Sequence, residues 1–233
     1  MEGKPLAPSF SRCTLRRNWE AFWAHRVAPL HKRDAGDFYA EHAADLRLLF
    51  AKLNPRTVLE LGCGNGAMYS YLGFEGTAYK GVDFSKTMLR DFAARYPGVE
   101  LECGNIASFA DERQYDLIFM ESVAQYCDPD KLATVFKSVR SLMHKESVFT
   151  CSSIPLKAAR AAYMTGALAP PTRRSLLAVV KGRITASLPW PDSMGYWYEP
   201  RWVAELATNL GMRAEFYGCH SYVYRFHAVM RVA

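Results

Sequence analysis

The segment Val58–Gly66, with the sequence VLELGCGNG, constrains the fold more than any other part of this chain. An apolar stretch from Thr57 to Leu61 predicts a β-strand, and glycines follow at the alternate positions 62, 64 and 66. Because glycine has no Cβ, the backbone can turn sharply there and approach a ligand closely. A helix that begins at this point would offer its first backbone N–H groups to the same ligand. The pattern therefore predicts the nucleotide-binding corner of a Rossmann-like α/β domain.

The glycine spacing by itself leaves other interpretations open. The sequence GCGNGA from position 62 also satisfies the dinucleotide fingerprint, and a tight strand-to-helix turn without a ligand would look the same. Two acidic residues narrow the choice. Glu60 lies two positions before the first glycine, and Asp83 ends a second predicted strand over residues 79–84. Asp83 follows the glycines by about 20 residues, where a ribose-binding carboxylate is expected.

The rest of the chain alternates between predicted strands and helices. Further strands are predicted over residues 99–103, 115–120 and 147–154, and helices over residues 67–72, 85–95 and 130–143. At the C-terminus, a helix over 200–210 precedes strands over 213–220 and 222–232. So short a connection permits only an antiparallel pair. The predicted fold class is α/β, with a Rossmann-like, seven-stranded and mostly parallel sheet that ends in a C-terminal antiparallel hairpin.

This order of motifs resembles class I S-adenosylmethionine-dependent methyltransferases. Glu60 and the three glycines resemble motif I of that family, Gly104-Asn105-Ile106 follows the third strand, and Tyr-Asp-Leu-Ile begins the fourth. The resemblance covers residues 55–155, and the terminal hairpin is typical of this family rather than of the usual dinucleotide domain. It implies methyltransferase activity (class EC 2.1.1), with S-adenosyl-L-methionine as cofactor and S-adenosyl-L-homocysteine as its product.

The resemblance also implies roles for residues around the cofactor. Glu60 and the glycine loop would meet the methionine portion, and Asp83 would accept hydrogen bonds from both ribose hydroxyls, since a carboxylate can accept two. The other cofactor-binding residues expected are Gly62, Cys63, Gly64, Gly66, Phe84, Met88, Asn105, Ile106, Glu121 and, from the N-terminal helix, Tyr39. Phe84 and Met88 would flank the adenine, and Asn105 and Ile106 would lie at its edge. Many family members have an acid where this chain has Asn105.

The acceptor site is expected at the carboxyl ends of the parallel strands. His220 and Tyr222 lie at the predicted hairpin tip, and His220 is the candidate general base, because an unperturbed histidine has a pKa near 6.5. Gln125 and Tyr126 follow the fourth strand and are candidates for catalytic contacts with the acceptor. A substrate-binding aromatic wall is expected from Tyr196, Trp197 and Tyr198. The alternative interpretations are a surface histidine at 220 and core packing for the aromatic residues; His227 is expected in the sheet or core.

Four segments organise the chain. Residues 1–54 form a helical cap over the cofactor, with a short aromatic helix around Trp19, Phe22 and Trp23 and an amphipathic helix over 37–53; residues 55–154 form the cofactor-binding core. Residues 155–199 are a helical lid and substrate insertion, and residues 200–233 complete the core. The insertion carries six basic and two acidic residues, which suits an acidic or lipid-linked acceptor or an anionic membrane surface. A homodimer contact is the other interpretation of this insertion.

Composition limits the remaining possibilities. The chain has 233 residues, of which 50% are hydrophobic, and its apolar runs are shorter than the ~20 residues of a membrane span. Six scattered cysteines without a C-x-x-C pair favour neither zinc nor a disulfide framework. Free thiols and an N-terminus without an apolar signal core favour a cytoplasmic protein. The formal charge of +6 makes nucleic acid a candidate partner.

The leading functional hypothesis is methyl transfer to an oxygen, with nitrogen as the second choice, of a small molecule or sugar. The segments Ser193–Tyr196 and Tyr224–Ala228 resemble bacterial methyltransferases of polysaccharide and natural-product biosynthesis. One alternative is an RNA methyltransferase, against which stand the lack of an RNA-binding module and of an Asn/Asp-Pro-Pro-aromatic motif. A second alternative is a cofactor-binding partner subunit that does not catalyse.

Overall fold

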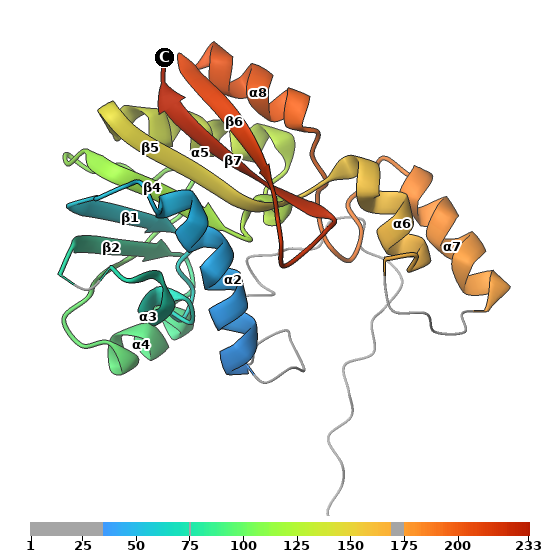
Figure 1. The fold of residues 1–233 in the computed structure, drawn as a ribbon, viewed down its shortest axis with the longest axis horizontal. Helices are drawn as coiled ribbons and strands as arrows, with labels where there is room; N and C mark the ends of the chain where they lie inside the picture. Colours follow the sequence, from blue (N-terminus) through green and yellow to red (C-terminus); the bar gives the residue numbers. More distant parts are fainter. Residues whose placement is uncertain (1–34, 75, 169–174) are drawn as a thin grey trace, which may run out of the picture.

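The chain forms a single seven-stranded sheet in the order β3-β2-β1-β4-β5-β7-β6 (Figure 1). The computed structural model describes residues 35–74, 76–168 and 175–233. The strands are β1 (Thr57–Leu61), β2 (Ala78–Asp83), β3 (Glu100–Cys103), β4 (Tyr115–Glu121), β5 (Met143–Pro155), β6 (Met212–Gly218) and β7 (Arg225–Val232). Strands β1 to β5 pair in parallel, and β7 lies antiparallel between β5 and β6. The predicted fold class is confirmed, while the aromatic helix expected around Trp19 falls outside the described residues.

Helices cover both faces of the sheet. The helices α2 (Ala35–Phe50), α3 (Tyr69–Leu72) and α4 (Lys86–Arg95) pack on one face, and α5 (Pro129–Ser141) and α8 (Pro200–Asn209) pack on the other (Figure 1). Successive side chains of a strand point to opposite faces, so Val58 contributes to the first core and Leu59 to the second. Burial on both faces explains why the central strands read as nearly continuous apolar runs.

The glycine corner has the conformation that its sequence predicts. Gly62, Gly64 and Gly66 have φ angles of +81°, +54° and +69°, which side chains other than glycine rarely adopt. Packing adds a second requirement, because a Cβ on Gly66 would lie 2.5 Å from the ring of Phe92. The helix expected from residue 67 begins two residues later, at Tyr69, since residues 66–68 remain in the turn.

Two helix boundaries follow from capping residues. The Ser85 hydroxyl accepts a hydrogen bond from the backbone N–H of Met88 and starts α4, as predicted. The Asp128 carboxylate likewise accepts a hydrogen bond from the backbone N–H of Lys131 at the start of α5, and Pro129 lies in the first turn of this helix. Helix α5 ends at Ser141 rather than Met143, and β5 begins at Met143 rather than Ser147. Met143 pairs with Tyr115 and the register then shifts, an irregularity that strand periodicity could not reveal.

The connection between the last two strands is longer than predicted. Strand β6 ends at Gly218 and β7 begins at Arg225, so the turn comprises residues 219–224, called the hairpin loop below. The prediction placed His220 and Tyr222 in the strands or between them, and both lie in this loop. The physical reason is a competing partner, because the backbone N–H groups of His220 and Ser221 donate to the carboxylate of Asp45 on α2 instead of to the sheet.

The segment between β5 and α8 folds as a helical insertion beside the sheet (Figure 1). It contains the 3-10 turn η2 (Lys157–Ala159), α6 (Arg160–Thr165) and α7 (Leu176–Ser187), where shorter helices were expected over 156–163 and 175–180. The guanidinium of Arg160 pairs with Asp192 at 2.9 Å and donates to the carbonyls of Leu188 and Trp190. These bonds join the beginning and the end of the insertion. None of the described helices is long and apolar enough to cross a membrane.

Candidate active site

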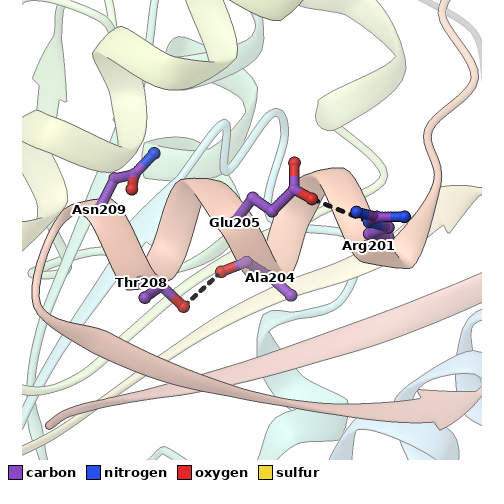
Figure 2. Close-up of a pocket in the computed structure, with 5 residues that line it drawn as sticks. All are labelled: Arg201, Ala204, Glu205, Thr208 and Asn209. Carbon is purple, nitrogen blue, oxygen red and sulfur yellow. Dashed lines mark hydrogen bonds and ion pairs between the residues drawn. The ribbon is translucent and has the colours of Figure 1, made fainter.

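The candidate site lies where the carboxyl ends of β1, β2, β4 and β5 meet α2 and the hairpin loop. A different hollow runs along α8, lined by Arg201, Ala204, Glu205, Thr208 and Asn209 (Figure 2). All five residues belong to one helix, and their polar groups bond along it: Arg201 pairs with Glu205, and Thr208 donates to the carbonyl of Ala204. Polar groups from several elements do not converge there, so this hollow is not the candidate site.

Asp83 connects the glycine corner to the start of α4. One carboxylate oxygen accepts the backbone N–H of Gly64 at 3.0 Å, and the other accepts that of Ser85 at 2.8 Å. Burial raises the pKa of Asp83, while these N–H groups act in the opposite direction. Phe84 is exposed beside it, and Met88 lies near Gly64. Asp83, Phe84 and Met88 thus border the glycine corner, and their contacts with a cofactor stay a prediction.

Glu60 is a buried carboxyl group in the middle of the sheet. The hydroxyl of Tyr79 donates to it at 2.5 Å. Burial raises the pKa of Glu60 to about 8, with a further contribution from the charges of Glu121 and Asp83. Glu60 therefore carries a proton at neutral pH in this structure, and a cationic ligand nearby would favour its ionised form.

His42 and Glu121 form an ion pair at the end of β4. The imidazole Nε2 lies 2.5 Å from a Glu121 oxygen, to which the hydroxyl of Ser122 also donates. Burial lowers the pKa of His42, but the charge and hydrogen bond of Glu121 outweigh it, so the net shift is upward. Burial raises the pKa of Glu121, but His42 and neighbouring hydroxyls lower it overall. The second oxygen of Glu121, Oε2, is buried without a hydrogen-bond partner, so this carboxylate has an acceptor oxygen to offer a ligand.

A second polar group joins α2 to β7 and the hairpin loop. Nε2 of His227 donates to Asp45 at 3.2 Å, and the backbone N–H of Ser153 points to His227 Nδ1 at 3.3 Å. The Sγ atom of Cys219 lies within 4.8 Å of a carboxylate oxygen of Asp45 and of a ring nitrogen of His227. Since Nδ1 accepts, Nε2 must carry the proton. The cluster is therefore a hydrogen-bonded contact between elements, and His227 is fully buried in the sheet, as expected.

Ser122 and Ser153 lie side by side in an uncommon backbone conformation. Their φ angles are +55° and +54°; Ser122 directly follows β4, and Ser153 lies near the end of its paired strand β5. Left-handed conformations cost free energy in residues other than glycine and concentrate at functional sites. The two serines also contact the groups described above, because Ser122 donates to Glu121 and the Ser153 hydroxyl lies 3.3 Å from His42 Nε2.

Arg225 is a buried cation at the start of β7. It is 8% exposed, and none of the ion pairs among the described residues includes it. Its guanidinium donates to Gln125 Oε1 at 2.9 Å, the Ser153 carbonyl at 2.8 Å, the Ser122 hydroxyl at 3.3 Å and the Met194 sulfur at 3.1 Å. The rings of Tyr222 and Tyr224 lie 5.1 and 5.7 Å away. Its Nε is buried without a hydrogen-bond partner.

The structure distributes the other predicted site residues unevenly. Gln125 is buried and accepts a hydrogen bond from Arg225, and Tyr126 follows it in the short helix η1 (Ala124–Tyr126). The ring of Tyr222 contacts both His42 and Arg225. His220 contributes only its backbone N–H, and its side chain is exposed. Its role as general base stays a prediction.

Three aromatic residues were expected to form a substrate wall. Tyr198 is buried in the core, and its hydroxyl donates to the carbonyl of Cys127 at 2.5 Å. Its place in the wall is a correction, because the ring is buried in the core, where it contacts Trp202. Tyr196 and Trp197 are half-buried, and the indole N–H of Trp197 donates to Asp192.

The remaining cofactor candidates lie around the rim. Asn105 is exposed and accepts the backbone N–H of Ala107, and Ile106 packs against the core. Tyr39 lies on α2 near His42, and Cys63 is buried within the glycine corner. Sequence reasoning missed Asp45 and Arg225 and did not choose His42. The i, i+3 spacing of His42 and Asp45 on one helix was the available sign.

Comparison with known proteins places this geometry in context. Residues 58–146 match the family model described as "Methyltransferase domain". A trans-aconitate 2-methyltransferase of Methylobacterium radiotolerans is 31% identical over 143 residues, which is 60% of this chain and 48% of that protein. A protein of the same description from Methylobacterium nodulans is 34% identical over 102 residues, 43% of this chain and 39% of that protein. The chain thus spans less than half the length of these relatives.

Solved structures share the fold at low identity. The DhpI–SAH complex has a TM-score of 0.63 at 17% identity, covering 92% of this chain and 95% of that one. A S-adenosylmethionine-dependent methyltransferase of Clostridium acetobutylicum has a TM-score of 0.62 at 14% identity, covering 84% and 92%. The glycopeptide N-methyltransferase MtfA, complexed with S-adenosylmethionine, has a TM-score of 0.59 at 14% identity, covering 82% and 87%. The class I fold predicted from the motif order is confirmed.

Proposed function

We propose that this protein transfers a methyl group from S-adenosyl-L-methionine to an oxygen of a small acidic molecule. The match of residues 58–146 to the methyltransferase domain model supports the methyl transfer. S-adenosyl-L-homocysteine is the product of the cofactor. The observation that carries the acceptor class is Arg225, a buried guanidinium without a carboxylate partner among the described residues. The trans-aconitate 2-methyltransferases that resemble this chain support the same class.

The cofactor pocket fits a cationic nucleoside. The glycine corner and Asp83 suit the ribose, with Phe84 and Met88 on the adenine side. The lowered pKa of Glu121 favours its ionised form, and its buried oxygen Oε2, which has no hydrogen-bond partner, would accept an ammonium donor. Glu60 adds a second carboxyl group that a nearby cation would ionise. We therefore assign Glu121 as the hydrogen-bond acceptor of the methionine ammonium. Glu60, once ionised, would add a second negative charge nearby.

The acceptor is proposed to bind through an acidic group on Arg225. Buried charges are ordinarily paired, because an unpaired charge loses its hydration without compensation. In Arg225 the bonds go to neutral oxygens and a sulfur, so an incoming carboxylate would supply the missing counter-charge. Tyr222 and Tyr224 flank the guanidinium and would border the ligand.

The residues would position the reactants rather than form a covalent intermediate. S-adenosylmethionine supplies an activated methyl group on a sulfonium. A carboxylate acceptor is already ionised at neutral pH, since its ordinary pKa is about 4, and it would need alignment but no general base. His42 would then keep Glu121 ionised and oriented, because, despite burial, the charge and hydrogen bond of Glu121 raise the pKa of His42 and favour its protonated form.

Two measurements test the proposal. Calorimetric titration of S-adenosylhomocysteine should show binding to the wild type and a loss of about 1.5–3 kcal/mol in Asp83→Asn, the value typical of hydrogen bonds to a charged group. The control Asp91→Asn changes an exposed carboxylate on α4 and should bind as the wild type does. No binding to the wild type would contradict the proposal and favour a partner subunit that does not catalyse.

The acceptor half of the proposal is tested with Arg225→Gln and Arg225→Lys. Methyl transfer should be assayed on small polycarboxylic acids beginning with trans-aconitate, with the corresponding amides as neutral controls. We expect KM for the acid to rise at least about tenfold, because a charged hydrogen bond contributes roughly 1.5–3 kcal/mol, while the affinity for S-adenosylhomocysteine is unchanged. An equal loss of cofactor affinity would assign Arg225 to the cofactor instead.

An RNA acceptor is the second candidate, favoured by the net charge of +6. Purified protein that carries nucleic acid, seen as excess absorbance at 260 nm and removed by ribonuclease, would support it. Protein free of nucleic acid that methylates a small acid would exclude it as the main function.

A further inference from the structure

Helix α7 presents an apolar surface to solvent. Leu176 and Leu177 are 79% and 82% exposed, and Val180, Ile184, Leu188 and Trp190 are exposed as well. The helix lies at the outer end of the insertion, away from the sheet (Figure 1). Single exposed leucines are ordinary on a protein surface, but a contiguous apolar group indicates an interaction site.

The apolar residues lie opposite the contact that α7 makes with α6. That contact passes through Gly182, where a Cβ would lie 2.4 Å from the carbonyl oxygen of Met164. With about 100° of rotation per residue, Leu177, Val180 and Ile184 lie roughly 160–220° around the helix from Gly182. Lys181 and Arg183 lie about 100° from Gly182 on either side. A stripe of aliphatic side chains therefore faces away from the protein with one basic residue on each flank.

The charge of this region decides which partner suits it. Of the six basic residues between Glu146 and Asp192, Lys157 and Arg160 pair with Glu199 and Asp192, whereas none of the ion pairs among the described residues includes Lys181 or Arg183. Self-association through α7 would bring Lys181 and Arg183 of two copies together, and like charges in contact repel. A nucleic acid would pair with the basic residues but leave the aliphatic stripe in water. An anionic lipid surface accommodates both, since aliphatic groups enter the headgroup boundary and basic groups meet the phosphates.

We propose that α7 attaches this protein reversibly to an anionic membrane surface. Leu177, Val180 and Ile184 enter the boundary between headgroups and acyl chains, and Lys181 and Arg183 contact lipid phosphates. The rings of Tyr163 and Trp197 contact each other, and Tyr163 also contacts Tyr224. Tyr163 lies on α6, which packs against α7, and Tyr224 borders Arg225. Attachment through α7 would therefore connect the membrane to the candidate site through α6. This inference does not depend on methyl transfer.

Vesicle co-sedimentation of the full chain tests the inference. We expect binding to vesicles of phosphatidylcholine with phosphatidylglycerol, little binding to phosphatidylcholine alone, and release at high salt. The double variant Leu177→Glu/Ile184→Glu should lose binding to the anionic vesicles. Its matched control is Leu48→Glu, an exposed leucine on α2, which should bind as the wild type does.

Charge variants separate the electrostatic contribution. Lys181→Gln/Arg183→Gln should lower the partition coefficient about tenfold or more, since one basic residue near an anionic surface contributes about fivefold. Lys137→Gln on α5 is the control. Equal binding to both vesicle types, no binding to either, or an equal loss in the control variants would overturn the inference. A dimer in light scattering that Leu177→Glu/Ile184→Glu dissolves would assign the surface to self-association instead.

Discussion

At the scale of single residues, the site contains buried carboxyl groups whose pKa values differ because their hydrogen-bond and charge partners differ. Against the effect of burial in each case, the pKa of Glu121 is lowered mainly by His42, and that of Asp45 by hydrogen bonds with Cys219 and His227. Glu60 has a raised pKa because it is buried beside two other carboxylates. Arg225 is a cation without a carboxylate partner among the described residues. Such a set favours a cation at one end of the site and an anion at the other.

Glu60 leads to a prediction about stability and pH. Its pKa is about 8 in the folded chain and about 4.3 in an unfolded one, so between these values the folded state binds a proton that the unfolded state has released. The contribution of Glu60 to the free energy of unfolding should therefore be fully present below about pH 4 and decrease as the pH rises towards 8. Glu60→Gln should lack this decrease, and at pH 8 it should be more stable by roughly 3–5 kcal/mol, since each pKa unit of the difference corresponds to about 1.4 kcal/mol.

Urea unfolding of both proteins at pH 6 and pH 8 measures the effect. The variant keeps an acceptor for the Tyr79 hydroxyl, so the comparison isolates the carboxyl proton. An identical pH dependence in the two proteins would show that Glu60 ionises normally and would remove it from the proposed electrostatics of the cofactor pocket.

At the scale of elements, the site depends on contacts between segments that are distant in the sequence. Helix α2 supplies His42 to the end of β4 and Asp45 to the hairpin loop. Ser122, directly after β4, and Ser153, near the end of β5, are neighbours with positive φ angles. Strand β7 begins with Arg225, which bonds to Gln125 after β4 and to the Ser153 carbonyl near the end of β5. The carboxyl edge of the sheet is thus covered by elements from both ends of the chain.

Asp45→Asn tests the contact between α2 and the hairpin loop. The carboxylate accepts the N–H groups of His220 and Ser221 and the Nε2–H of His227. We expect the variant to lose about 1–3 kcal/mol of unfolding free energy, as charged hydrogen bonds are replaced by neutral ones, and the loop amides to exchange faster with deuterium.

Asp91→Asn, which changes an exposed carboxylate on α4, is the control. Because the pKa of Asp45 is lowered, its contribution is present above about pH 4 and is lost as pH falls further. Unchanged exchange in residues 219–224 would contradict the role assigned to Asp45.

At the scale of the whole molecule, the insertion is a unit that rests beside the sheet rather than within it. Arg160 and Asp192 join its two ends, and Trp197 shares the same carboxylate. The Arg160 and Asp192 side chains are largely buried, so removing one leaves the other without its counter-charge. The insertion also contacts the core through the backbone bond from Tyr196 to the Gln125 carbonyl and through the rings of Tyr163, Trp197 and Tyr224.

Arg160→Gln should loosen the insertion and leave the core folded. Trypsin should cleave after Lys181 and Arg183 on α7 several times faster than in the wild type, because local opening exposes the helix backbone. The control Arg201→Gln removes an exposed pair on α8 and should not alter cleavage. Equal digestion of wild type and Arg160→Gln would show that the insertion is held by other contacts.

Much of the architecture could be read from local patterns. The glycine corner, the caps at Ser85 and Asp128 and the alternation of strands and helices depend on short-range backbone preferences, and the structure confirms them. The errors lie at boundaries set by distant partners. Strand β5 begins early because Met143 pairs with Tyr115, and β6 ends early because Asp45 captures the loop amides.

The sequence by itself determined the class of the protein: a parallel sheet with a glycine corner, two acids spaced for a nucleoside and a terminal antiparallel pair. Those features rest on intrinsic backbone geometry and on side-chain periodicity, which act between neighbours. Only the tertiary structure decided that His42 pairs with Glu121, that Tyr198 lies in the core and that Arg225 is buried without a carboxylate partner among the described residues. The physical reason is that burial and charge pairing arise when segments some 70 to 180 residues apart meet, as Ser153 and Asp45 meet His227.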